Sequence, residues 1–251
     1  MESEKIKIVI LAAGHGKRMK SDAPKALAMF KGKPFIQHIL DTIKQLDPKI
    51  KPIIVVGHKK EQVQEALGDG HIYAEQKEQL GTGHAVMSAK DAINGEHKIV
   101  LVISADQPML SSKTLERIIS THLAKNPSIT LGTVVVSDFE DWRTRMYTDF
   151  GRIVRRTDGS VSKIVEFKDA NEAERKIQEL NPALYAFDAE WLWSNINKIK
   201  NENAQAEYYL TDLVKLACDQ NKKIEAIPVA NIIEALQPNS KEELEILEKI
   251  A

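Results

Sequence analysis

The sequence predicts an α/β fold in which a mostly parallel sheet is covered by helices on both faces. Continuous apolar runs at residues 7–12, 52–56 and 98–103 are typical of strands that are buried on both sides. Segments with the apolar spacing of a helix separate these runs, at residues 34–46, 60–67 and 83–93. With 251 residues, of which 43% are hydrophobic, the chain is long enough to bury the sizeable core that such a fold needs.

The rhythm of strands and helices changes after residue 136. A helix at 114–123 and a β-rich run at 129–136 close the first half, and the polar stretch at 138–149 predicts a mobile excursion. Two strands joined by a turn at Asp158 and Gly159 are expected at residues 151–156 and 160–167. The remaining elements are expected to be a strand at 184–187, helices at 189–199 and 208–219, a strand at 225–229 and a charged helix at 241–250. We therefore expect the second half to add a β-rich lobe that closes over the edge of the sheet.

Composition and charge exclude several classes of protein. No apolar stretch approaches the roughly 20 residues that a membrane span needs, and the acidic N-terminus has no long apolar segment, so neither a membrane partner nor a secretory signal is expected. The net charge of −1 argues against a nucleic-acid partner. The single cysteine, Cys218, rules out an internal disulfide and favours a reducing, cytoplasmic location. Its helical setting indicates a packing role rather than a nucleophile.

A loop rich in small and basic residues follows the first expected strand. It begins with the run LAAG at residues 11–14 and continues through Lys17 and Arg18 to Lys25. Such a loop places backbone N–H groups and cations where a polyphosphate could bind, although a tight strand-to-helix turn remains an alternative. It has neither the ending of a P-loop nor the glycine spacing of a dinucleotide fingerprint. Gly14 and Asp106 both come just after buried strands, where ligands bind in parallel sheets, so we expect them in one site.

Longer motifs connect this loop to a known family. They are QLGTGHA at residues 79–85, DQP at 106–108, GRIVR at 151–155, IVEFKDA at 164–170 and AQAEYYLTD at 204–212. Together with the opening loop they resemble the uridylyltransferase (pyrophosphorylase) domain of the bifunctional bacterial N-acetylglucosamine-1-phosphate uridyltransferase, within the sugar-nucleotidyltransferase superfamily. The resemblance runs from about residue 7 to about residue 244.

The resemblance implies a fold and a division of the chain. The fold is the nucleotide-diphospho-sugar transferase fold, a Rossmann-like, mostly parallel mixed sheet flanked by helices with a small β-rich sugar-binding lobe. Residues 1–251 would form a single nucleotidyltransferase domain. Its nucleotide-binding part would cover about residues 1–136, its sugar-binding part about 137–230, and its C-terminal helix about 231–251.

The resemblance also assigns roles to particular residues. The nucleotide-binding positions would be Leu11, Ala12, Ala13, Gly14, Lys25, Gln76, Gly81, Thr82, Ser104 and Ala105. The catalytic positions would be Arg18, Lys25 and Asp106, with the two cations holding the triphosphate and neutralising its charge. The sugar would be held by Gly151, Glu166 and Asn181. Gln76 offers a donor and an acceptor to a uracil edge, with a solvent-facing loop residue as the alternative.

Mg²⁺ is the cofactor that the resemblance implies, with Asp106 and Asn239 as its ligands. Asn239 is equally well interpreted as the N-cap of the last helix, so both roles stay open. The seven histidines show no zinc-like spacing, and no Ser/His/Asp or Cys/His set suggests itself.

The implied reaction is transfer of a uridylyl group from UTP to a sugar 1-phosphate, N-acetylglucosamine 1-phosphate in the family. The chain departs from the family's pattern at Ser104 and Ala105, where Tyr-Gly is common, at Pro182 and Ala183, where Thr-Gly is common, and at Lys17, where threonine is usual. These changes leave open another nucleotide, sugar or polyol phosphate. The hexapeptide repeat of an acetyltransferase β-helix is not found, so acetyl transfer is not expected and the oligomeric state stays open.

Overall fold

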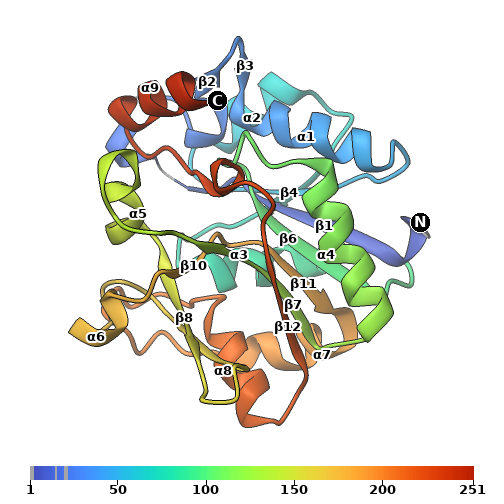
Figure 1. Cartoon of the computed structure of the whole chain (residues 1–251). Coiled ribbons are helices and arrows are strands. Elements are labelled where there is room, and N and C mark those ends of the chain that lie inside the picture. Colours follow the sequence, from blue (N-terminus) through green and yellow to red (C-terminus); the bar gives the residue numbers. More distant parts are fainter. Residues whose placement is uncertain (1–2, 15, 20–21) are drawn as a thin grey trace.

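The computed structural model of the chain describes residues 3–14, 16–19 and 22–251. The strands are β1 Ile6–Leu11, β2 Met29–Phe30, β3 Lys33–Pro34, β4 Ile53–Val56, β5 Ile72–Glu75, β6 Ile99–Ser104, β7 Ile129–Val135, β8 Gly151–Arg155, β9 Val161–Val165, β10 Glu179–Asn181, β11 Tyr185–Asp188 and β12 Ile224–Pro228. The α-helices are α1 Phe35–Leu46, α2 Lys60–Leu67, α3 Thr82–Ala89, α4 Ser112–Lys125, α5 Thr144–Asp149, α6 Glu172–Arg175, α7 Ala189–Asn195, α8 Asp212–Asp219 and α9 Lys241–Ile250. Figure 1 shows how these elements surround one central sheet.

The central sheet is mixed, with the strand order β5-β4-β1-β6-β11-β7-β10-β8-β9 and with β12 beside β7. Strands β5, β4, β1 and β6 run parallel, whereas β11, β10, β8 and β9 add antiparallel pairs. Leu11, at the end of β1, pairs with Val55 on one side and Ser104 on the other. The carboxyl ends of β1, β4 and β6 therefore meet at one edge of the sheet, which is where parallel sheets bind their ligands.

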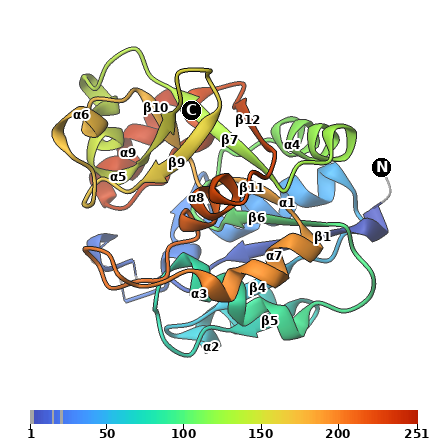
Figure 2. The ribbon, with the colours of Figure 1, turned by 90° about the horizontal axis from the view of Figure 1, so that it is seen from below.

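Helices cover both faces of the sheet, as the continuous apolar strands predicted. Ile8 and Ile10 of β1 pack with α1, α2 and α4, whereas Val9, which points to the other face, packs with α3, α7 and α8. Figure 1 shows α1 and α2 above the strands β4, β1 and β6 and α7 and α8 below them, and Figure 2 looks onto the face that α3, α7 and α8 cover. Ile8, Val9 and Ile10 are all fully buried, on alternating faces of the sheet, and burying such a side chain stabilises the folded chain by about 1.5–3 kcal/mol.

The small lobe is built on the antiparallel end of the sheet. The hairpin of β8 and β9 has its turn at Asp158 and Gly159, as predicted, and β10 joins it to β7. Helix α9 lies beside α5 in both views, and Arg145 of α5 forms an ion pair with Glu243 of α9 at 3.7 Å. The C-terminal helix is therefore docked on the segment that leads into the lobe. The main sheet also takes in β11 and β12 from the second half of the chain.

Several elements differ from the prediction. The stretch 138–149 was expected to be a mobile excursion, but it ends in α5, whose Met146 is fully buried. Strands β2, β3, β5 and β10 were not predicted. The helix expected from residue 208 begins only at Asp212, because the backbone of Tyr208 bonds to Leu80 and Gly83 instead. Among the described residues, none of the helices combines the length and the apolar character that crossing a bilayer requires.

Candidate active site

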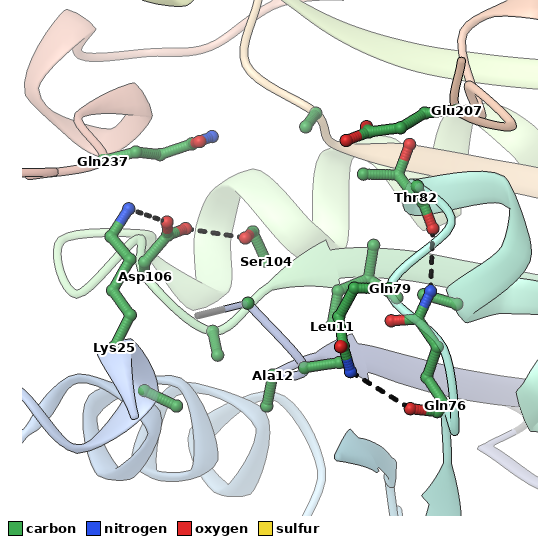
Figure 3. Close-up of a pocket in the computed structure, with 17 residues that line it drawn as sticks. Leu11, Ala12, Lys25, Gln76, Gln79, Thr82, Ser104, Asp106, Glu207 and Gln237 are labelled. Atoms are coloured by element: carbon green, nitrogen blue, oxygen red, sulfur yellow. Dashed lines mark hydrogen bonds and ion pairs between the residues drawn. The ribbon is translucent and has the colours of Figure 1, made fainter. Parts of the chain in front are cut away.

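A cavity of about 350 Å³ opens at the carboxyl ends of β1, β5 and β6. Its lining is Leu11, Ala12, Ala13, Gly14, Lys25, Ala26, Gln76, Gln79, Gly81, Thr82, Ala85, Ser104, Ala105, Asp106, Ala183, Glu207 and Gln237. Every residue that the sequence assigned to the nucleotide is in this lining, together with Asp106. Figure 3 shows these side chains converging on the cavity from both sides.

The wall of the cavity at Gly81 and Thr82 is held by the segment that precedes α8. Gly83 donates its N–H to the carbonyl of Tyr208 at 2.8 Å, and Tyr208 donates to the carbonyl of Leu80 at 2.7 Å. Gly81 has φ +105°, and a Cβ there would lie 2.7 Å from the oxygen of Tyr208. The runs 79–85 and 204–212, which carry the most specific part of the family resemblance, are therefore in direct contact and require glycine at the point where their backbones meet.

Gln76 lies at the bottom of the cavity and is only 3% exposed. Its Nε2 donates to the carbonyl of Gly81 at 3.0 Å and lies 3.2 Å from Nδ1 of His84. The solvent-facing alternative is therefore wrong, because the side chain is buried against the loop. Since the amide nitrogen is held by the protein, the carbonyl oxygen Oε1 is the atom of Gln76 that can accept a hydrogen bond from a ligand in the cavity.

A cluster of charged and amide groups occupies the opposite end of the cavity. The ammonium of Lys25 contacts Oδ2 of Asp106 and donates to Oδ1 of Asn239 at 2.6 Å. Ser104 donates its hydroxyl to the other oxygen of Asp106 at 2.6 Å. Two oxygens from distant parts of the sequence thus converge on one cationic group. The same pair of oxygens is a suitable start for a Mg²⁺ site, because Mg²⁺ takes one or two protein oxygens and completes its shell with phosphates and water.

Asn239 is free for this role because another residue caps the last helix. Ser240 is the N-cap of α9 and accepts a hydrogen bond from the backbone N–H of Glu243. The side chain of Glu243 in turn accepts from the N–H of Asn239 at 2.8 Å. The N-cap interpretation of Asn239 is therefore wrong, and its amide points back toward Lys25.

Asp149, at the end of α5, connects two of the predicted residues. Arg18 donates to Oδ2 of Asp149 at 2.8 Å, and Asn239 donates its Nδ2–H to the same oxygen at 2.9 Å. Arg18 is not among the described residues that line the cavity, and its side chain is 57% exposed. Sequence reasoning missed Asp149 because no motif includes it, whereas Gln79 and Glu207 of the lining lie inside recognised motifs.

The three residues expected to hold a sugar lie close together on the small lobe. Gly151 and Asn181 are paired in β8 and β10, and a Cβ at Gly151 would lie 3.3 Å from either carboxylate oxygen of Glu166. Burial raises the pKa of the Glu166 carboxyl, and a hydrogen bond of 3.1 Å from Thr211 offsets part of that effect. These three residues are not among the described lining of the cavity, but Asn181 accepts from the N–H of Ala183, which is, at 3.2 Å.

Three of the residues that depart from the family's pattern, Ser104, Ala105 and Ala183, line the cavity. Ala105 lines the cavity and is 2% exposed. Ala183 has φ +58°, a left-handed conformation that usually favours glycine, and its methyl group therefore stands at a strained position beside the cavity. The carbonyl of Pro182 accepts amide hydrogens from Gln107 at 2.7 Å and from Gln237 at 3.0 Å. These two glutamines fix the turn that carries Ala183.

A family profile described as the MobA-like NTP transferase domain matches residues 8–171, which are more than half of the chain and carry most of the cavity's lining. The chain belongs to this family.

Individual relatives agree with this membership. The "Bifunctional protein GlmU" of Bacillus velezensis is 41% identical over 233 residues, which make up 93% of this chain and 49% of that protein. The "Bifunctional protein GlmU" of Thermoanaerobacter pseudethanolicus is 42% identical over 242 residues, or 96% of this chain and 50% of that protein. The chain thus spans about half the length of these curated relatives.

Solved structures confirm the predicted fold. A UDP-glucose pyrophosphorylase complexed with UDP-glucose aligns over 97% of both chains with a TM-score of 0.75 and 16% identity. A CMP:2-keto-3-deoxy-manno-octonic acid synthetase complexed with CTP aligns over 98% of both chains with a TM-score of 0.69 and 18% identity. At these identities the likeness concerns the fold alone. The mixed sheet flanked by helices therefore has the same fold as these two proteins.

Proposed function

We propose that the chain transfers a uridylyl group from UTP to N-acetylglucosamine 1-phosphate, forming UDP-N-acetylglucosamine and pyrophosphate. The observation that supports this most strongly is the single cavity that gathers Gln76, the main chain of residues 11–14 and the cluster of Lys25 and Asp106. The relatives named "Bifunctional protein GlmU" support the same activity. The proposal concerns only nucleotidyl transfer, because the chain covers about half of those proteins.

The proposed chemistry is a direct displacement. A phosphate oxygen of the sugar 1-phosphate forms a bond to the α-phosphorus of UTP, the bond to the bridging oxygen breaks, and pyrophosphate leaves with that electron pair. The attacking phosphate is already ionised near neutral pH, so the protein needs no strong general base. Its task is to hold the two anions in line and to offset their charge, which is the role we assign to Lys25 and Arg18.

We propose Asp106 and Asn239 as the protein ligands of Mg²⁺. Their oxygens fit this group, because Oδ2 of Asp106 and Oδ1 of Asn239 both contact the ammonium of Lys25 and so lie within reach of one cation. A bound Mg²⁺ would supply positive charge to the phosphate oxygens of the nucleotide. Lys25, which contacts both oxygens, is then positioned to donate to a phosphate at the same end of the cavity.

The sugar-binding part, which we place in about residues 137–230, would use three kinds of group. Gly151 offers a close backbone approach, Glu166 a carboxylate for hydroxyl groups, and Asn181 a side-chain amide. About residues 1–136 would bind the nucleotide, and about residues 231–251 bring Asn239 to the metal. We place this activity in the cytoplasm, because the lone Cys218 fits a reducing compartment.

Transfer to another sugar or polyol phosphate, or from another nucleotide, is the alternative that Ala105 and Ala183 favour, since both methyl groups stand on the cavity wall. A Mg²⁺-dependent pyrophosphate-release assay decides between them when UTP, dTTP and CTP are each combined with several sugar and polyol phosphates. We expect the highest kcat/KM with UTP and N-acetylglucosamine 1-phosphate. A higher kcat/KM with another pair would identify that pair as the substrates. No pyrophosphate release with any pair would refute the proposed nucleotidyl transfer.

A further inference from the structure

The carboxylate of Asp149 lies at a junction that neither the sequence motifs nor the proposed mechanism explains. It is 13% exposed and stands where the end of α5 meets the loop that precedes α9. Oδ2 accepts hydrogen bonds from Arg18 and Asn239, and Oδ1 accepts from Arg18 at 3.0 Å. Arg18 and Asn239 are separated by most of the chain, so Asp149 is the group that ties them together.

The orientation of the Asn239 amide follows from its two neighbours. An amide has one end that only donates and one end that only accepts. The ammonium of Lys25 can only donate, so the atom facing it is Oδ1, and the carboxylate of Asp149 can only accept, so the atom facing it is Nδ2. Asp149 therefore selects the one rotation of the amide that presents an oxygen to the cation cluster. With the amide turned over, two N–H groups would face that cluster instead.

Arg18 keeps the carboxylate in place for this task. Its NH1 group contacts both oxygens of Asp149, at 2.8 Å and 3.0 Å, and so holds the carboxylate beside Asn239. The three groups form a continuous chain of charge-assisted hydrogen bonds that ends at the oxygen proposed for the metal. Partners of this kind hold metal ligands in their binding orientation, and their loss typically weakens metal affinity about 10–100-fold.

We propose that Asp149 is a positioning residue that turns the amide oxygen of Asn239 toward the divalent cation of the nucleotide complex. The inference rests on the proposed function, because it takes Asn239 as a metal ligand. It adds a residue on α5, outside the matched motifs, on which the metal affinity of the site depends.

The test compares two substitutions at one position. Asp149→Ala removes the acceptor, whereas Asp149→Asn keeps an oxygen that can accept from Nδ2 of Asn239 but removes the charge. The readout is the dissociation constant of Mn²⁺ from the complex of chain, Mn²⁺ and UTP, followed by water-proton relaxation with no sugar phosphate present. We expect Mn²⁺ affinity to fall at least tenfold in Asp149→Ala and to stay within about threefold of the native value in Asp149→Asn.

Controls separate positioning from a general effect on the segment. Asp138→Ala removes another Arg-paired carboxylate of the 138–149 stretch, which binds Arg143 at 2.6 Å, and should leave Mn²⁺ affinity unchanged. Asp149→Ser, whose hydroxyl is too short to reach Asn239, replaces Asp149→Ala if the latter does not fold. Native affinity in Asp149→Ala, or an equal loss in Asp149→Asn, would overturn the inference while leaving the proposed function intact. Failure of the native chain to form the ternary complex would overturn both.

Discussion

The close approach of Gly81 to Tyr208 gives a prediction whose size follows from the structure. Gly81 has φ +105° and ψ 175°, a region that is essentially restricted to glycine, so an alanine there costs about 1–3 kcal/mol. Its Cβ would also lie 2.7 Å from the oxygen and 2.9 Å from the nitrogen of Tyr208, and displacing that backbone costs about a further 1–3 kcal/mol. We therefore expect Gly81→Ala to lower the free energy of unfolding by about 2–6 kcal/mol, measured by urea denaturation.

Gly68→Ala is the matched control for this measurement. Gly68 has nearly the same backbone angles, φ 81° and ψ 178°, but a Cβ built there meets no atom of the described residues within 4 Å. Gly68→Ala should lower the free energy of unfolding only by the about 1–3 kcal/mol of the unfavourable backbone conformation, and should leave UTP affinity unchanged. Gly81→Ala should also weaken UTP binding. Equal unfolding free energies and equal UTP affinities in the two variants would refute the contact between the two motifs as the support of the cavity wall.

Three further predictions concern the charged groups. Lys25→Ala should lower kcat about 10²–10³-fold without unfolding the chain, and near-native turnover would contradict its role. Glu166→Ala should raise the KM of the sugar phosphate more than that of UTP; an unchanged sugar KM would argue against its placement. His122 is 4% exposed, and burial lowers its pKa from 6.5 to about 4. Below pH 6.5 the unfolded chain therefore gains a proton that the folded chain does not, and acidification to pH 4 should cost about 3 kcal/mol of stability. His122→Gln should flatten this loss in urea titrations across that range, and an unchanged slope would contradict the assignment.

The sequence predicted those strands and helices that a local pattern of apolar residues determines. The apolar runs predicted β1, β4 and β6, and Gly14 and Asp106, which follow two of these strands, line one cavity as expected. Strand β5 was missed because only Ala74 of its four residues is buried, so it lacks the continuous apolar pattern of its neighbours. The residues around Tyr208 have a helical pattern, but their backbone groups are taken by Leu80 and Gly83, a contact that no local pattern encodes.

In the candidate site, too, local motifs predicted some residues, whereas others depend on contacts between segments that are distant in sequence. The residues that the motifs assigned to the nucleotide line one cavity, whereas Gly151 and Glu166, which also lie in motifs, are outside its described lining. Asp149 lies in a polar stretch that has no motif, and its importance comes from Arg18 and Asn239, which are distant in sequence. The two interpretations of Asn239 could be separated only when the structure showed Ser240 as the N-cap of α9.

A crystal structure of the chain with UTP and Mg²⁺ tests the central claim most directly, because it locates the base and the three phosphates at once. We predict the uracil against Gln76 and Gly81, and the phosphates at the end of the cavity that holds Lys25 and Asp106. A nucleotide bound elsewhere, or with its phosphates turned away from Lys25, would contradict the account.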